Sequence, residues 1–162
     1  MTLAVGDRVD ITLDRPAHGG ICVGRHEGQV IFARHGIPGE RVSVEITEVG
    51  SGSRFLRADV TAVLSASPDR VQPRCEYAGR CGGCDWQHVS IARQRSIKSE
   101  IVREQMVRVA GMQPADPLLE QLTVEPCGED PEGFGYRTRM DFVADARGRL
   151  GLRASRSHDV IA

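Results

Sequence analysis

The stretch IPGERVSVEI, residues 37–46, is the part of the sequence that decides the fold class. From Arg41 to Ile46 polar and apolar side chains alternate, which predicts a strand with one buried face. Pro38 and Gly39, directly before it, are typical of a turn. We therefore expect a strand over Arg41–Val49 that begins at a tight turn.

Four further short segments have the composition of strands, and glycine-rich linkers separate them. They are Arg8–Leu13, Gly20–Arg25, Val30–Arg34 and Phe55–Leu64. Five strands in about sixty residues predict a small OB-like barrel, since closing the sheet removes its exposed edges. The small, polar stretch 65–69, which contains Pro68, predicts a domain boundary. We expect a barrel over residues 1–66 and a second, α+β unit over residues 67–162.

Three cysteines follow this boundary within ten residues: Cys75, Cys81 and Cys84. Gly82 and Gly83 let the backbone turn so that two of the thiols can reach one centre. Thiolates bind zinc or the iron of an iron–sulfur cluster. Adding His88 gives C-x5-C-x2-C-x3-H, a possible four-coordinate zinc site. A [4Fe–4S] cluster with a fourth ligand from elsewhere is the alternative, and spacing alone does not separate the two.

After the cysteines, the sequence predicts a helix that Ser90 caps and that runs to about Ala110. Residues 113–132 are acidic and contain proline, so we expect a loop there. A hairpin is expected from Tyr136–Ala144 and Arg149–Arg153. The fold class is therefore mainly β, with an incomplete α+β unit after the barrel.

Basic residues are unevenly distributed, although the net charge is only −1. Residues 70–108 and 134–158 are rich in arginine and flank the acidic stretch 113–132, so they are where a nucleic-acid backbone would bind. Arg137 and Arg139 lie two apart on the expected strand and share one face, which suits phosphate contacts. Trp86 and His88 are candidates for stacking on a base, and the alternative for Trp86, which we favour, is packing against the cluster.

The sequence has no signal-peptide pattern at Met1, no apolar run long enough for a membrane span, and five cysteines, an odd number. We expect a reduced, cytoplasmic protein without membrane contact, and a monomer. Cys22 lies inside a strand pattern and is predicted to be a small buried residue. Cys127 is predicted to be a loop thiol that can at most substitute for a missing metal ligand.

Two parts of the chain resemble known families. Three segments, at residues 5–7, 19–25 and 37–42, resemble a TRAM domain, a small RNA-binding barrel found in RNA-modifying enzymes. Residues 75–88 resemble the cluster segment of the RNA uracil-C5 methyltransferases, the bacterial enzymes that make 5-methyluridine. The most specific element is Cys81-Gly82-Gly83-Cys84 followed by Gln87-His88. Segments 136–140, 148–152 and 157–160 also match that family, in its order.

The resemblance to the methyltransferases favours the [4Fe–4S] cluster on Cys75, Cys81 and Cys84, with a structural role. It implies that the fourth ligand is missing from these 162 residues, since the family's fourth cysteine would lie beyond Ala162. In that family a cysteine attacks uracil C6 and the methyl group comes from S-adenosylmethionine. No catalytic residue and no S-adenosylmethionine-binding residue is recognised here.

The sequence therefore predicts the RNA-recognition part of a uracil-C5 methyltransferase acting on ribosomal or transfer RNA. This chain alone is expected to be inactive, with S-adenosylmethionine bound only by the full-length enzyme. A stand-alone, non-catalytic RNA-binding protein with a zinc or iron–sulfur site is the alternative. A glycine-rich βαβ unit encoded after Ala162 would decide for the methyltransferase.

Overall fold

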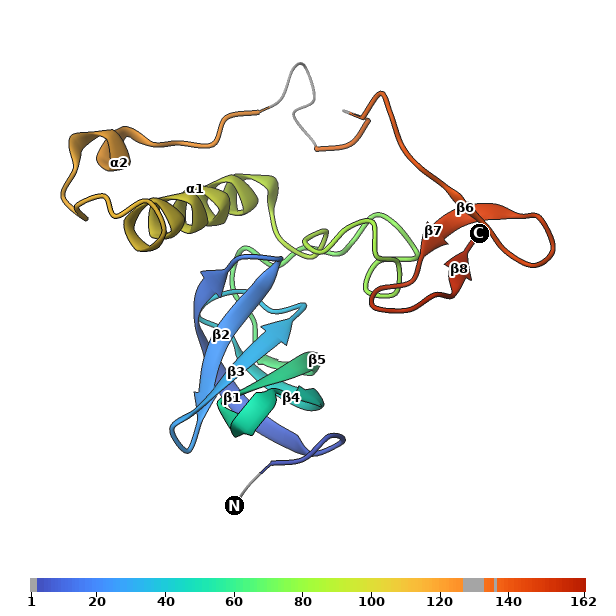
Figure 1. The fold of residues 1–162 in the computed structure, drawn as a ribbon, viewed down its shortest axis with the longest axis horizontal. Helices are drawn as coiled ribbons and strands as arrows, with labels where there is room; N and C mark the ends of the chain where they lie inside the picture. Colours follow the sequence, from blue (N-terminus) through green and yellow to red (C-terminus); the bar gives the residue numbers. More distant parts are fainter. Residues whose placement is uncertain (1–2, 127–132, 136) are drawn as a thin grey trace.

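The computed structural model describes residues 3–126, 133–135 and 137–162. A closed barrel forms the N-terminal part, with strand order β1-β2-β3-β5-β4 (Figure 1). Its strands are β1 (Arg8–Ala17), β2 (Ile21–His26), β3 (Gln29–Arg34), β4 (Arg41–Val49) and β5 (Phe55–Ser65). The five predicted strands and their closure into a barrel are thus confirmed.

The alternation that predicted β4 holds in three dimensions. Val42, Val44 and Ile46 are fully buried in the barrel core, while the residues between them point outward. They pack with Ile11 and Leu13 of β1 and with buried side chains of the other strands. β3 and β5 pair in parallel, and the other pairs are antiparallel. A one-turn 3-10 helix, Ser51–Ser53, connects β4 to β5.

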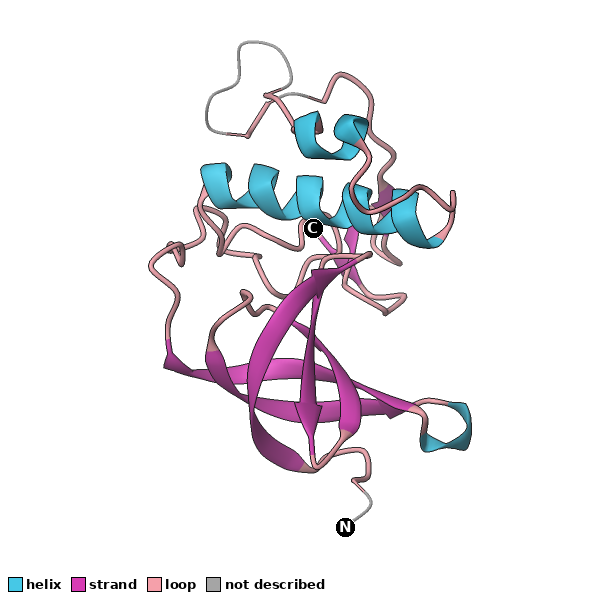
Figure 2. Cartoon of the chain, turned by 90° about the vertical axis from the view of Figure 1, so that its left-hand side faces the viewer, coloured by secondary structure: helices cyan, strands magenta, loops and turns pink. Residues whose placement is uncertain are grey.

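A single long helix, α1 (Ile91–Arg108), crosses one end of the barrel (Figure 2). Ser90 caps it as predicted, since its hydroxyl accepts a bond from the Arg93 amide. Glu104 of α1 binds Arg15 of β1 at 2.7 Å, which ties the helix to the barrel. Val109 follows the helix and is largely exposed.

A second helix, α2 (Pro117–Gln121), lies in the stretch predicted to be a loop. Asp116 caps its first turn and Pro117 occupies a first-turn position, where a missing N–H costs nothing. Arg103 of α1 holds its end by donating to the carbonyls of Leu119 and Leu122. The helix was missed because five residues are too few for a periodic pattern.

The C-terminal residues form a three-stranded antiparallel sheet, β6-β7-β8. Its strands are β6 (Val143–Ala144), β7 (Leu150–Arg153) and β8 (Val160–Ile161). The hairpin prediction is correct at its centre but too long, because β6 begins only at Val143. Arg137 and Arg139 therefore lie in an irregular segment and not on a strand, and Tyr136 lies outside the described residues.

A second, smaller core joins the barrel to the rest of the chain. Ile37, from the turn after β3, packs with Val89 and Ile97, and all three are buried. Trp86 and Ile101 pack against this cluster. The turn that begins the IPGERVSVEI stretch is thus also the surface on which the second unit rests.

Candidate nucleic-acid interface and cysteine loop

The three clustered cysteines lie in one irregular segment, residues 75–88, which we call the cysteine loop. The Cys75 amide donates to the Gln87 side chain at 3.2 Å, and the Gly83 amide donates to the Cys81 sulfur at 3.4 Å. Cys75 and Cys81 are half-buried, Cys84 is exposed, and none is in a disulfide. In the described ranges no three His, Cys, Asp or Glu side chains gather into a metal-binding group.

The donor chemistry of this loop nevertheless fits an iron–sulfur cluster. Three free thiols lie within ten residues, and a backbone amide already points at one sulfur, as amides do at cluster ligands. Assembly of the cluster would require the three thiols to converge from the positions described here. The assignment of Cys75, Cys81 and Cys84 as ligands remains a prediction.

The His88 side chain points toward the barrel and not toward the three thiols. Its side chain is buried, its exposed fraction is 7%, and its Nε2 lies 3.4 Å from the Gly36 carbonyl of the barrel. The His35 ring packs edge-on against it. Burial lowers the pKa of His88 to about 4, and the Arg70 charge acts in the same direction. The ring therefore faces the barrel and not RNA or solvent, and the structure gives no support for base stacking by His88.

Trp86 is half-buried and packs against the second core of Ile37, Val89 and Ile97. The Gln94 side chain of α1 donates to the carbonyls of Trp86 and Val89, which fixes the end of the cysteine loop on the helix. Trp86 thus has a packing role in the structure, and its contact with RNA stays a prediction.

A buried carboxylate attaches the second unit to the barrel. Glu40 is completely buried, and its two oxygens accept two bonds of 2.7 Å from Arg70. They also accept the amides of Ile37 and Ser67. Burial alone would raise the pKa of Glu40, but these hydrogen bonds hold that pKa below its ordinary value. From the sequence, the segment before β4 was predicted only to be a turn. A local sequence pattern does not show that the Glu40 carboxylate finds its partners beyond the domain boundary.

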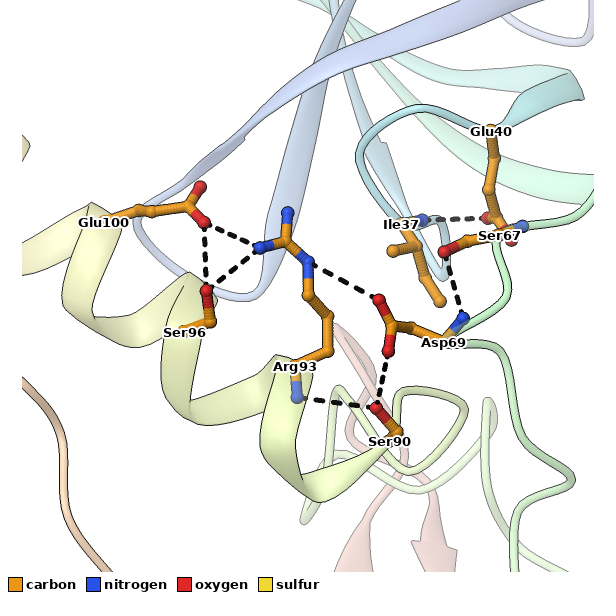
Figure 3. Close-up of polar contacts among 8 residues, drawn as sticks. All are labelled: Ile37, Glu40, Ser67, Asp69, Ser90, Arg93, Ser96 and Glu100. Carbon is orange, nitrogen blue, oxygen red and sulfur yellow. Dashed lines mark hydrogen bonds and ion pairs between the residues drawn. The ribbon is translucent and has the colours of Figure 1, made fainter.

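Figure 3 shows how the same boundary continues to the helix. The Ser67 hydroxyl accepts the Asp69 amide, and the Asp69 carboxylate accepts the Ser90 hydroxyl at 3.0 Å. Ser90 in turn caps α1 at Arg93, whose guanidinium binds Glu100. The predicted boundary at 65–69 is therefore bonded to both the barrel and the helix. The division of the chain into units over residues 1–66 and 67–162 remains a prediction.

Five arginines from three parts of the chain line a groove of about 830 Å³. They are Arg34 at the end of β3, Arg137 and Arg139 before β6, Arg153 at the end of β7, and Arg156 in the loop after β7. We call this the arginine groove. Two carboxylates, Asp85 and Asp141, also line it, so arginines outnumber acidic residues by five to two. The sequence pattern indicated Arg137 and Arg139, and the arginine-rich stretch 134–158 also contains Arg153 and Arg156, but no pattern pointed to Arg34.

Short contacts fix the walls of the arginine groove. The Gly82 amide donates to the Arg153 carbonyl at 2.9 Å, and the Ser155 amide donates to the Arg80 carbonyl at 2.9 Å. Gly20 of the β1–β2 turn approaches Asp85 so closely that a Cβ there would lie 2.7 Å from the Asp85 Cβ. The barrel, the cysteine loop and the C-terminal sheet thus meet at this groove.

The remaining cysteines do not add to the site. Cys22 is buried in the barrel, as predicted, and its thiol donates to the Gly36 carbonyl. Burial raises the pKa of Cys22 to about 12, so the thiol stays protonated. Cys127 lies outside the described residues. Within the part of the chain that the structure describes, no helix is long and apolar enough to cross a membrane.

The barrel belongs to a known domain class: residues 3–61 match the TRAM domain. The chain as a whole is homologous to RNA methyltransferases. It is 46% identical, over 96% of its length, to an uncharacterised RNA methyltransferase of Streptomyces coelicolor. A similar protein of Streptomyces avermitilis is 44% identical over 96% of the chain.

Relatives with a stated reaction are more distant. The chain is 34% identical, over 99% of its length, to the 23S rRNA (uracil(1939)-C(5))-methyltransferase RlmD of Pseudomonas aeruginosa. It covers 34% of that protein, 35% of the Streptomyces coelicolor protein and 37% of the Streptomyces avermitilis protein. The chain thus spans about a third of the length of the curated relatives it matches.

Proposed function

We propose that these residues are the RNA-recognition part of an S-adenosylmethionine-dependent methyltransferase that forms 5-methyluridine in ribosomal or transfer RNA. The observation that carries this proposal is that one stretch of similarity runs from the TRAM barrel through the cysteine loop to the C-terminal sheet. The Pseudomonas aeruginosa relative that shares this similarity is named as a uracil-C5 methyltransferase of ribosomal RNA. Methylation of a uracil ring requires a base outside the helical stack, so the recognition part must hold single-stranded or loop RNA.

We further propose that Cys75, Cys81 and Cys84 hold a [4Fe–4S] cluster with a structural role. When bound, the cluster would join the ends of a loop that has little regular structure of its own. The loop contacts α1 at one end and the C-terminal sheet in its middle, through the bridge between Cys81 and Ala154. Methyl transfer itself involves no redox step, so no electron-transfer role is required of the cluster.

The reaction can be tested on the protein encoded by the whole reading frame that contains these residues. RNA labelled with tritium at C5 of uridine releases tritium when C5 is methylated, whereas methylation at another atom leaves the label in place. We expect tritium release that depends on S-adenosylmethionine. Methyl incorporation without tritium release would contradict the uracil-C5 assignment, and absence of both together with tight RNA binding would favour a non-catalytic RNA-binding protein.

A further inference from the structure

We propose that the arginine groove binds the phosphate backbone of single-stranded RNA, and that Arg34, Arg153 and Arg156 are binding residues together with Arg137 and Arg139. This inference rests on the proposed function and adds the surface on which RNA lies. It also places the main phosphate contacts outside the strand face of the barrel. OB-type barrels commonly bind oligonucleotides on the face formed by their second and third strands.

The charge of the groove supports an anionic ligand. Five guanidiniums face two carboxylates along its lining, while the whole chain has a net charge of −1. A concave surface with an excess of one sign of charge concentrates the field of that excess. Arginine also presents planar, paired donors that match the oxygens of a phosphodiester. Arg137, Arg139, Arg153 and Arg156 are all exposed and accessible to such a ligand.

The floor and one wall of the groove are already ordered. Arg34 is buried at the end of β3 with its guanidinium 4.0 Å from the Asp85 carboxylate, and this ion pair fixes its side chain at the groove. Arg153 is held by a contact of 2.6 Å between its Nη1 and the Nδ1 of His158. Arg156 has a left-handed backbone, φ 53°, in a loop closed by the bond from the Ala154 amide to the Asp159 carbonyl. Little side-chain and loop entropy is then lost on binding.

The extent of the groove favours a chain of phosphates over a single anion. Its arginines come from the barrel, from the segment before β6 and from the loop after β7, and they line a volume of about 830 Å³. This volume is far larger than one phosphate group fills. A flexible single strand can place successive phosphates against them, as strands do in other positively charged grooves.

The test measures binding of a fluorescein-labelled, uridine-containing single-stranded RNA of about 16 nucleotides, the upper end of OB-fold site sizes. The 162-residue chain is purified anaerobically and compared with two groove variants, Arg153→Ala with Arg156→Ala, and Arg137→Ala with Arg139→Ala. The matched control is Arg25→Ala with Arg54→Ala, which removes the same charge from two exposed arginines outside the groove and outside both arginine-rich stretches. Arg25 lies on β2, so it also tests the barrel face.

Each groove variant should bind about tenfold more weakly or worse, because charge-assisted bonds to phosphate are lost. The slope of log affinity against log salt should become shallower by about 1.4, or about 0.7 for each lost contact with a single strand. The control should bind within about twofold of the parent chain. Circular dichroism and thermal melting establish that each variant is folded.

Equal losses in groove and control variants, or no loss in either groove variant, would overturn the groove assignment and leave RNA recognition to another surface. Failure of the parent chain to bind the RNA would overturn the groove and the proposed function together. The two failures are therefore distinguishable.

Discussion

The Arg70 guanidinium donates two hydrogen bonds of 2.7 Å to the fully buried Glu40 carboxylate, one to each oxygen. A third donor bond runs from Arg70 to the His35 carbonyl at 2.9 Å. Glu40 belongs to the turn before β4, and Arg70 follows the boundary between the two units. This single pair thus fixes the start of the second unit on the barrel.

Removing Arg70 should destabilise the chain strongly. Arg70→Ala leaves the Glu40 carboxylate buried without its charged partner, and such losses cost about 3–5 kcal/mol. The control is Arg8→Ala, which removes an exposed ion pair with Glu45 and should cost less than about 1 kcal/mol. Urea unfolding at neutral pH measures both. Similar free energies of unfolding for the two variants would show that the Glu40–Arg70 pair does not hold the units together.

Stability should fall in mildly acidic solution because of His88. Its pKa is about 4 in the folded chain against an ordinary value of 6.5, so the unfolded chain binds the proton more tightly. The contribution is complete above about pH 6.5 and is lost as the pH falls toward 4, by about 3 kcal/mol in total. Burial and the Arg34 charge also lower the pKa of His35, which adds to the same trend.

Unfolding free energies measured between pH 7 and pH 5 check this expectation, above the range in which Glu40 titrates. His88→Gln should flatten the dependence on pH, and His18→Gln, a change at an exposed turn, should not. An unchanged slope in His88→Gln would mean that this histidine is not buried in its neutral form.

The cysteine ligands can be tested by metal content. Anaerobically purified chain should contain iron and acid-labile sulfide and absorb broadly in the visible range. Cys81→Ser or Cys84→Ser should remove most of both, whereas Cys22→Ser should retain them because Cys22 is buried in the barrel. Stoichiometric zinc without sulfide would instead indicate the alternative zinc site, which would also require His88 to turn away from Gly36.

Gly82 should link the cysteine loop to the arginine groove. A Cβ at this position would lie 2.9 Å from the Arg153 carbonyl, so Gly82→Ala must displace the backbone that carries Arg153. We expect weaker binding of single-stranded RNA with the thermal stability of the barrel unchanged. Gln72→Ala, an exposed neutral change shortly before the loop, is the control. Full RNA affinity in Gly82→Ala would contradict the coupling.

Much of the fold was predictable because its signals are local. The period-two pattern of β4 reports directly which side chains face the core, and the glycine-rich linkers mark where strands end. The Ser90 cap likewise depends only on the residues next to it. Prediction from local signals fails where a strand depends on pairing with another strand. Residues 137–142 have strand-like composition, yet β6 begins only at Val143.

The sequence by itself determined the barrel, the helix α1 and the clustering of three thiols, since each follows from spacing along the chain. Only the tertiary structure decided that Glu40 binds Arg70, that His88 turns toward Gly36, and that Arg34 lies in the same groove as Arg153 and Arg156. These relationships join residues 30 or more positions apart. Charge and burial at such a distance depend on how the units pack, and no local pattern records that packing.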